Sequence, residues 1–273
     1  MNISRQMAPA ALATALSAAL ATGLAACDAI PPSSSAGSAA TSSAGSSSAA
    51  AAGNGAGSQS ASTSADPLAS LTATQVFDKA LANTSAASSV HLVGSGKDSG
   101  STITFTLDIS KGTGCSGAIA EGSKGSFKLI VLGKTVWVKP DSAFWKSAAG
   151  SGASASVLSL LEGKYLKGTT GSSGLSSLSQ ICALSDLISQ QPLKAATLTR
   201  TGTSTFGGSP VLVLTDSTTN GIADVTDQAQ PLVARIIGKG SDGGAITFSN
   251  YNAPVTITAP PASEVIDGSK YGF

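Results

Sequence analysis

Residues 102–109 read Thr102-Ile103-Thr104-Phe105-Thr106-Leu107-Asp108-Ile109. Every second position is apolar, and the positions between carry Thr or Asp. Successive side chains of a strand point to opposite faces of its sheet, so this segment has one apolar face and one polar face. The alternation predicts a half-buried strand of an antiparallel sheet, with one face on a core and the other in water.

More strands are predicted on both sides of this segment. Short runs rich in Val, Ile, Thr and Phe, bounded by Gly, Asn, Asp or Pro, lie at residues 90–94, 118–121, 127–132, 135–139, 196–201, 211–215, 222–225, 232–238, 245–250 and 255–258. Gly133-Lys134, Asn220-Gly221 and Asp242-Gly243 are hairpin signals between them. An antiparallel sheet with this many strands tends to curl or close.

Helical spacing occurs in fewer places. Thr72-Ala73-Thr74-Gln75 resembles a capping box and precedes apolar residues at helical spacing, which predicts a helix of about three turns. Residues 142–149, 154–161 and 175–190 are also predicted to be helical, and Pro192 ends the last of them. The fold class expected is α+β, with one large curled antiparallel sheet and a helical insert between two groups of strands.

The first 26 residues have the pattern of an export signal. Arg5 supplies a positive charge, residues 8–26 carry none, and the segment ends in Leu24-Ala25-Ala26-Cys27. This ending resembles the bacterial lipobox, which implies that a diacylglycerol is attached to the Cys27 thiol and that the chain is cut before Cys27. The alternatives are an uncleaved membrane-spanning helix and an ordinary secretory signal beside a coincidental cysteine.

Residues 27–66 are predicted to be a lipidated cysteine followed by a flexible tether. The segment is nearly all Ser, Ala and Gly, so it cannot bury enough apolar surface to offset the entropy lost on ordering. Residues 67–273 are then one domain, which is long enough for a core. Loss of Arg5 with the signal leaves 15 Lys and Arg against 15 Asp and Glu. This balance argues against nucleic-acid binding and against recruitment to anionic head groups by charge.

Two cysteines remain after lipidation of Cys27. In an exported domain, Cys115 and Cys182 are expected to form a disulfide. The alternatives are two free thiols or a metal-binding pair. His91 is the chain's single histidine, so a zinc site with four ligands is difficult to assemble, and we expect no metal and no cofactor.

Three segments carry a resemblance to a known family. Residues 251–260 (Tyr-Asn-Ala-Pro-Val-Thr-Ile-Thr-Ala-Pro), Pro231 before residues 232–236, and Trp137-Val138-Lys139 followed by Phe144-Trp145 are similar to motifs of the actinobacterial LppX/LprAFG lipoproteins. That family has the LolA/LolB-like fold. The resemblance implies a half-barrel of about eleven strands with helices on its concave face, and some members of the family hold lipid tails between sheet and helices.

The resemblance also suggests where acyl chains of a lipid or glycolipid would lie. The candidate lining residues are Phe105, Leu107, Phe127, Leu129, Trp137, Phe144, Trp145, Leu160 and Leu161. An ordinary apolar core explains the same residues without a ligand.

No catalytic residue is predicted. Residues 112–117 match G-x-G-x-x-G, but a strand and not a helix follows, so we interpret them as a turn. His91 is expected to be an ordinary strand residue. The chain is therefore expected to be a non-enzymatic lipoprotein on the outer face of the cell membrane, favoured as a monomer, which carries lipid. The alternative is an envelope or sensory lipoprotein that binds a protein partner and no lipid.

Overall fold

The computed structural model of the chain describes residues 66–98, 100–149, 155–172, 175, 178, 180–184, 193–240 and 243–268. The predicted signal peptide and Cys27 lie outside the described residues, as do the tether up to residue 65 and most of the helix predicted over 175–190. Within the described residues, no helix is long and apolar enough to span a membrane.

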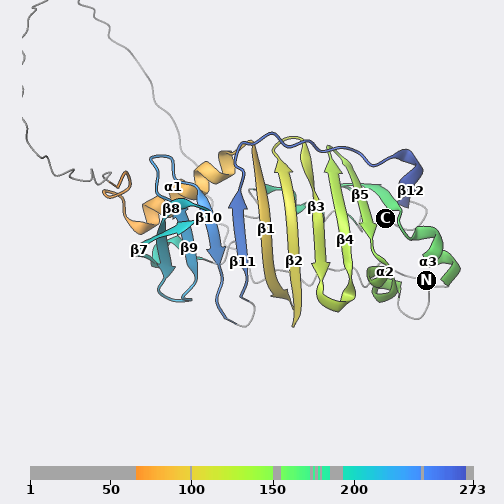
Figure 1. Cartoon of the computed structure of the whole chain (residues 1–273), viewed down its shortest axis with the longest axis horizontal. Helices are drawn as coiled ribbons and strands as arrows, with labels where there is room; N and C mark the ends of the chain where they lie inside the picture. Colours follow the sequence, from red (N-terminus) through yellow and green to blue (C-terminus); the bar gives the residue numbers. More distant parts are fainter. Residues whose placement is uncertain are drawn as a thin grey trace, which may run out of the picture. The chain divides into compact units, whose positions relative to one another are not determined.

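Twelve described strands form one sheet (Figure 1). Their bounds are β1 (Ser89–Asp98), β2 (Ser101–Ser110), β3 (Gly114–Glu121), β4 (Ser126–Leu132), β5 (Thr135–Pro140), β6 (Tyr165–Thr169), β7 (Leu198–Phe206), β8 (Ser209–Asp216), β9 (Ile222–Thr226), β10 (Val233–Ile237), β11 (Ala245–Ser249) and β12 (Val265–Asp267). The order across the sheet is β12-β6-β5-β4-β3-β2-β1-β11-β10-β9-β8-β7. Two antiparallel meanders thus join through the β1–β11 pair. β12 and β7 end the sheet without pairing with each other, so the expected α+β fold with a curled, unclosed sheet is confirmed.

Three details of the strand prediction are corrected. Residues 255–258 form no strand, because Pro254 and Pro260 lack backbone donors and the chain leaves the sheet at a turn in which Asn252 has a φ of 58°. β6 and β12 were not predicted. They are short, and they pair in parallel between segments distant in sequence, so neither alternation nor a turn signal marks them. β7 begins at Leu198, after a 3-10 turn at Ala195–Thr197.

Three of the four predicted helices are close to the α-helices of the structure, whereas the one predicted over 175–190 is interrupted in its described part by a turn at residues 181–182. α1 spans Ala73–Ala86, and the capping box between Thr72 and Gln75 is present. α2 (Ser142–Ala149) and α3 (Ala155–Leu161) follow β5. The Asp141 carboxylate accepts hydrogen bonds from the backbone N–H groups of Phe144, at 2.7 Å, and Ser126, at 2.8 Å. Burial opposes ionisation of Asp141, but these bonds lower its pKa overall.

The core lies on one face of the sheet, which we call the inner face. α1 buries Val76, Phe77 and Ala80 against it. Tyr251 Oη donates to the Val233 carbonyl at 2.6 Å, and Thr84 Oγ accepts from the Val233 N–H at 3.0 Å. Two of the segments that carry the family resemblance therefore meet at the end of α1.

Gly94 and Gly96 offer a matched test of the inner-face packing. Both lie on β1 and face inward, but a Cβ on Gly94 would lie 2.2 Å from the Phe105 ring, whereas a Cβ on Gly96 would meet nothing within 4 Å. We expect Gly94→Ala to destabilise the fold by about 1–3 kcal/mol through overpacking. Gly96→Ala should change stability little or raise it slightly. Equal urea midpoints for the two variants would contradict the packing described here.

Candidate functional site

The folded unit begins at a charged cluster. Arg200 on β7 donates to the Asp66 carboxylate at 3.1 Å, and its guanidinium also donates to the carbonyls of Leu68 and Leu71. Asp66 in turn accepts from the Leu68 N–H at 2.7 Å. One side chain of the sheet therefore fixes residues 66–71, where the predicted tether meets the domain.

A second carboxyl group lies in this cluster. Burial raises the pKa of Asp227, the neighbouring Asp66 carboxylate adds to the rise, and Arg200 opposes it. One oxygen of Asp227 is buried and has no hydrogen-bond partner within the described ranges of the chain. The cluster thus carries two acidic groups and one cation, and Asp227 retains its proton more readily than an exposed aspartate.

The raised pKa of Asp227 predicts a pH dependence of stability. Folding favours the protonated form, so the contribution of Asp227 is fully present below about pH 4, the ordinary value for aspartate, and is lost as the pH rises through the folded-state pKa. Asp227→Asn, which cannot ionise, should therefore gain stability relative to the native chain at pH 7 and lose that gain at pH 4. Urea midpoints of both chains across this range measure the effect. A constant difference between the two chains would contradict it.

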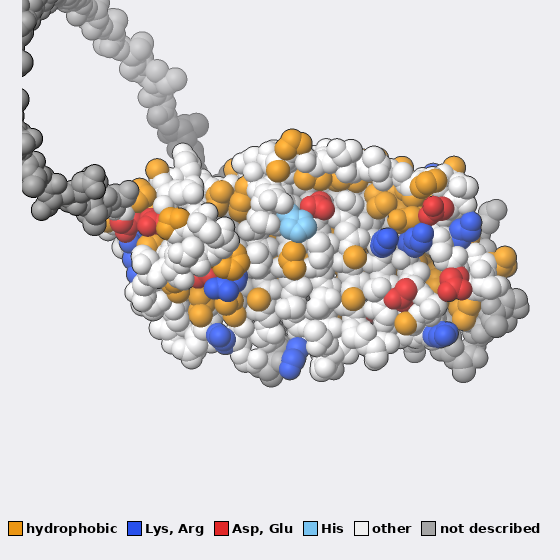
Figure 2. All heavy atoms as spheres, in the orientation of Figure 1, with side chains coloured by type: hydrophobic (Ala, Val, Ile, Leu, Met, Phe, Trp, Pro, Cys, Tyr) orange, Lys and Arg blue, Asp and Glu red, His pale blue; other side chains and the backbone are white. Residues whose placement is uncertain are grey.

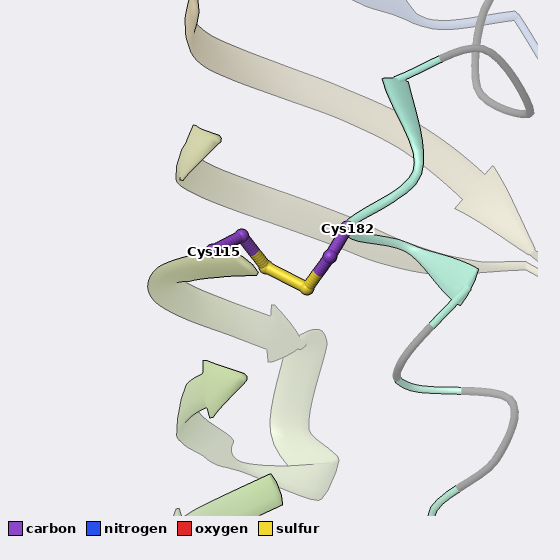
Figure 3. Close-up of a disulfide and its surroundings, with 2 residues drawn as sticks. All are labelled: Cys115 and Cys182. Carbon is purple, nitrogen blue, oxygen red and sulfur yellow. A yellow bond between two sulfur atoms is a disulfide. The ribbon is translucent and has the colours of Figure 1, made fainter. Parts of the chain in front are cut away.

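The predicted disulfide is present in the structure. Cys115 points inward from β3 and bonds to Cys182, with 5.4 Å between the Cα atoms (Figure 3). Cys115 is fully buried in the core. The bond ties the centre of the sheet to a segment that is 67 residues away in sequence.

The nine candidate lining residues do not form one wall. Leu107 and Leu129 are fully buried in the main core, with Phe105 and Phe127 packed against it. Phe144 contacts Phe127 edge to face, with ring centroids 5.5 Å apart. The remaining four are distributed as follows: Trp145 and Leu161 are buried in a second cluster, Trp137 is buried on the opposite face of the sheet, and Leu160 is 68% exposed.

The second cluster contains a polar atom that sequence reasoning missed. Trp145 of α2 packs with Leu161 of α3 and Leu166 of β6, and Leu158 and Ile266 lie against them. Trp145 is 6% exposed, and its Nε1–H donor has no hydrogen-bond partner among the residues that the structure describes. A buried donor without a partner costs about 1–3 kcal/mol. The sequence marks Trp145 as a candidate apolar residue. That its Nε1–H lacks an acceptor becomes evident only from the packing of α2, α3 and β6.

The opposite face of the sheet, which we call the outward face, carries few charges in its middle (Figure 2). His91 Nδ1 lies 2.7 Å from Asp108 Oδ1, and Ser249 is opposite His91 in the strand register. Beside this pair is a hollow of about 500 Å³ across β11, β1, β2, β3 and β4. Val93, Thr106, Ala118 and Ala120 are among its lining residues.

The glycine motif that was predicted to be a turn lies within the described residues. Residues 112–117 form a turn that enters β3, with Gly112 at a φ of 78°, so this glycine motif opens no helix. In the described part of the chain, no three His, Cys, Asp or Glu side chains gather in a way that could hold a metal ion.

No protein-family model and no curated protein matches the chain. Several solved structures, however, do match the chain. The chain is similar to two mycobacterial lipoproteins. LprF from Mycobacterium bovis is 16% identical, with 69% of this chain and 96% of LprF covered and a TM-score of 0.47. LppX from Mycobacterium tuberculosis is also 16% identical, with 68% and 97% covered and a TM-score of 0.43.

A third structure, an uncharacterised conserved protein from Thermus thermophilus, is 10% identical over 70% of this chain and 96% of its own, with a TM-score of 0.33. The resemblance to LppX and LprF that was expected from the sequence is thus also found when structures are compared, as a likeness of fold at low identity.

Proposed function

We infer that this chain is an exported lipoprotein that is held at the outer face of the cell membrane by a diacylglycerol on Cys27 and binds lipid acyl chains. The anchor is supported by Leu24-Ala25-Ala26-Cys27 and by the Ser/Ala/Gly-rich segment that follows it. The Cys115–Cys182 disulfide agrees with export, because disulfides persist in oxidising compartments.

The observation that carries lipid binding is the buried Nε1–H of Trp145, which lies among apolar side chains and has no acceptor in the described part of the chain. Ligand sites in proteins are mostly apolar and have a few well-placed polar groups. An ester or amide carbonyl of a lipid would supply the missing acceptor, while its acyl chain packs against Leu161 and Leu166. A donor of this kind distinguishes an acyl ester from a plain hydrocarbon.

The test is uptake of a fluorescent acyl ester by the delipidated full chain, with Trp145→Phe as the variant. The native chain should release lipid into organic solvent and then bind the ester saturably. Trp145→Phe keeps an aromatic ring and removes the donor, so its affinity for the ester should fall about fivefold, which corresponds to one hydrogen bond, while its affinity for a matched hydrocarbon probe stays the same. If the native chain neither releases lipid nor takes up the probe, the proposal fails.

A second candidate function is docking of a protein partner, which β7 favours. This strand ends the sheet, and most of its nine residues are exposed. Threonine occupies every second position along it, at Thr199, Thr201, Thr203 and Thr205. An exposed edge of this kind can accept a strand from another protein. Crosslinking from position 203 in intact cells tests it, and it fails if no protein is captured there.

A further inference from the structure

The hollow on the outward face is a trough that crosses five strands. Two rows of outward residues line it in register, one formed by Thr247, Val93, Thr106 and Ala118 and the other by Ala245, Ser95, Thr104 and Ala120. Neighbouring strands lie about 4.8 Å apart, so five strands give a trough roughly 19 Å long, and two residues along a strand give a width of roughly 7 Å. The trough exists because these side chains are small.

The chemistry of the trough favours an acyl chain over a peptide. Its side chains are uncharged, and Val93, at the centre, is 45% exposed. The backbone N–H and C=O groups of the middle strands are already paired in ladders on both sides. A peptide laid in the trough would lose water from its own amides and find few partners, which is costly. An acyl chain has no such groups and gains from burial.

The charges beside the trough differ between its two ends. At the β10 end, Arg235 is neutralised by the buried Asp224, whose Oδ2 lies 2.6 Å from the guanidinium. At the β4 end, Lys128 is exposed, lies opposite Ala118 in the register, and makes no ion pair among the described residues. Its neighbour Lys139 is paired with Glu264 at 3.0 Å. An anionic group is therefore attracted to Lys128 and not to the other end.

We propose that this trough binds one extended acyl chain, with an anionic head group at Lys128. This site is separate from the interior cluster around Trp145. The proposal rests on the proposed function, because it requires that the chain binds acyl chains. The shared ligand chemistry is a single saturated tail with a carboxylate or phosphate, as in a fatty acid or a lysophospholipid.

The test uses the full chain in phosphatidylcholine vesicles with palmitate that carries a photoreactive diazirine on its tail. Peptides labelled after illumination are mapped by mass spectrometry. We expect labels on the outward residues of β1, β2 and β3. Ala118→Phe fills the trough and should reduce this labelling at least fivefold, while Thr199→Phe, on the exposed edge strand β7, should leave it unchanged. Thermal unfolding of both variants confirms that they fold.

The head group is tested separately. Lys128→Gln should weaken palmitate and lysophosphatidic acid binding by about two- to fivefold, as expected for an exposed ion pair, and leave neutral monopalmitoylglycerol unchanged. A loss confined to palmitate identifies a fatty acid as the ligand, and a loss for both identifies the shared anionic chemistry. Equal losses for all three probes would overturn the assignment of the head group to Lys128.

The two proposals fail in different ways. If the native chain is not labelled anywhere, acyl binding itself is wrong. If it is labelled, but on the peptides that contain Trp145 and Leu161 and equally in Ala118→Phe, then acyl binding stands and the outward trough is not the site.

Discussion

Replacing Cys27 by serine is expected to move the chain from the membrane fraction to the soluble fraction almost completely. A serine hydroxyl cannot form the thioether that the lipobox motif leads us to expect, so no diacylglycerol is attached. Each buried CH₂ of an acyl chain contributes about 0.8 kcal/mol, and loss of two chains removes far more binding than surface charge could replace in a chain whose formal net charge is +1. Fractionation of cells grown with radiolabelled palmitate measures both the location and the label.

Cys115→Ser is the matched control for this experiment. It removes a cysteine that is buried in the core and bonded to Cys182, so its palmitate label should stay unchanged even though the fold loses its disulfide. A Cys27→Ser chain that still sediments with membranes would point to an uncleaved apolar segment as the anchor. A native chain that never incorporates palmitate would contradict the lipoprotein assignment directly.

Removing the disulfide with Cys115→Ala and Cys182→Ala together is expected to destabilise the fold by about 4 kcal/mol. In the chain-entropy model, a bond that closes a loop of 67 residues limits the unfolded chain by about this amount. Urea unfolding of the double variant should show a midpoint well below that of the native chain.

The native chain unfolded under reducing conditions is the comparison for the double variant. Reduction opens the same loop in the native chain and keeps both sulfur atoms. The reduced native chain and the double variant should therefore have similar urea midpoints. A double variant within about 1 kcal/mol of the oxidised native chain would mean that the segment around Cys182 is held by packing alone.

The parts of the fold that local patterns determine could be predicted from the sequence. β2 alternates strictly, the Gly133-Lys134 turn joins β4 and β5, and the capping box starts α1. β6 and β12 could not be predicted, because they pair in parallel through contacts distant in sequence. The predicted strand at residues 255–258 is wrong because Pro254 and Pro260 remove backbone donors, which outweighs the alternation at Val255 and Ile257.

The candidate sites were less predictable than the fold. The pairing of Cys115 with Cys182 follows from counting cysteines in an exported chain, and the structure confirms it. The missing partner of Trp145 depends on packing between α2, α3 and β6, which no local pattern encodes. The outward trough depends on strand register, because Ala118, Thr106 and Val93 become neighbours only when β1, β2 and β3 are aligned.

The irregular pairing of β7 with β8 affects how the open edges of two copies of the chain could associate. Proteins fixed to one surface meet their neighbours often, and a long open sheet edge invites end-to-end growth into fibrils. In β7 the register shifts between Arg200 and Gly202, which leaves Thr201 without an opposite residue and bends the strand. This kink prevents two such edges from pairing along their whole length, which disfavours edge-to-edge association of copies of the chain.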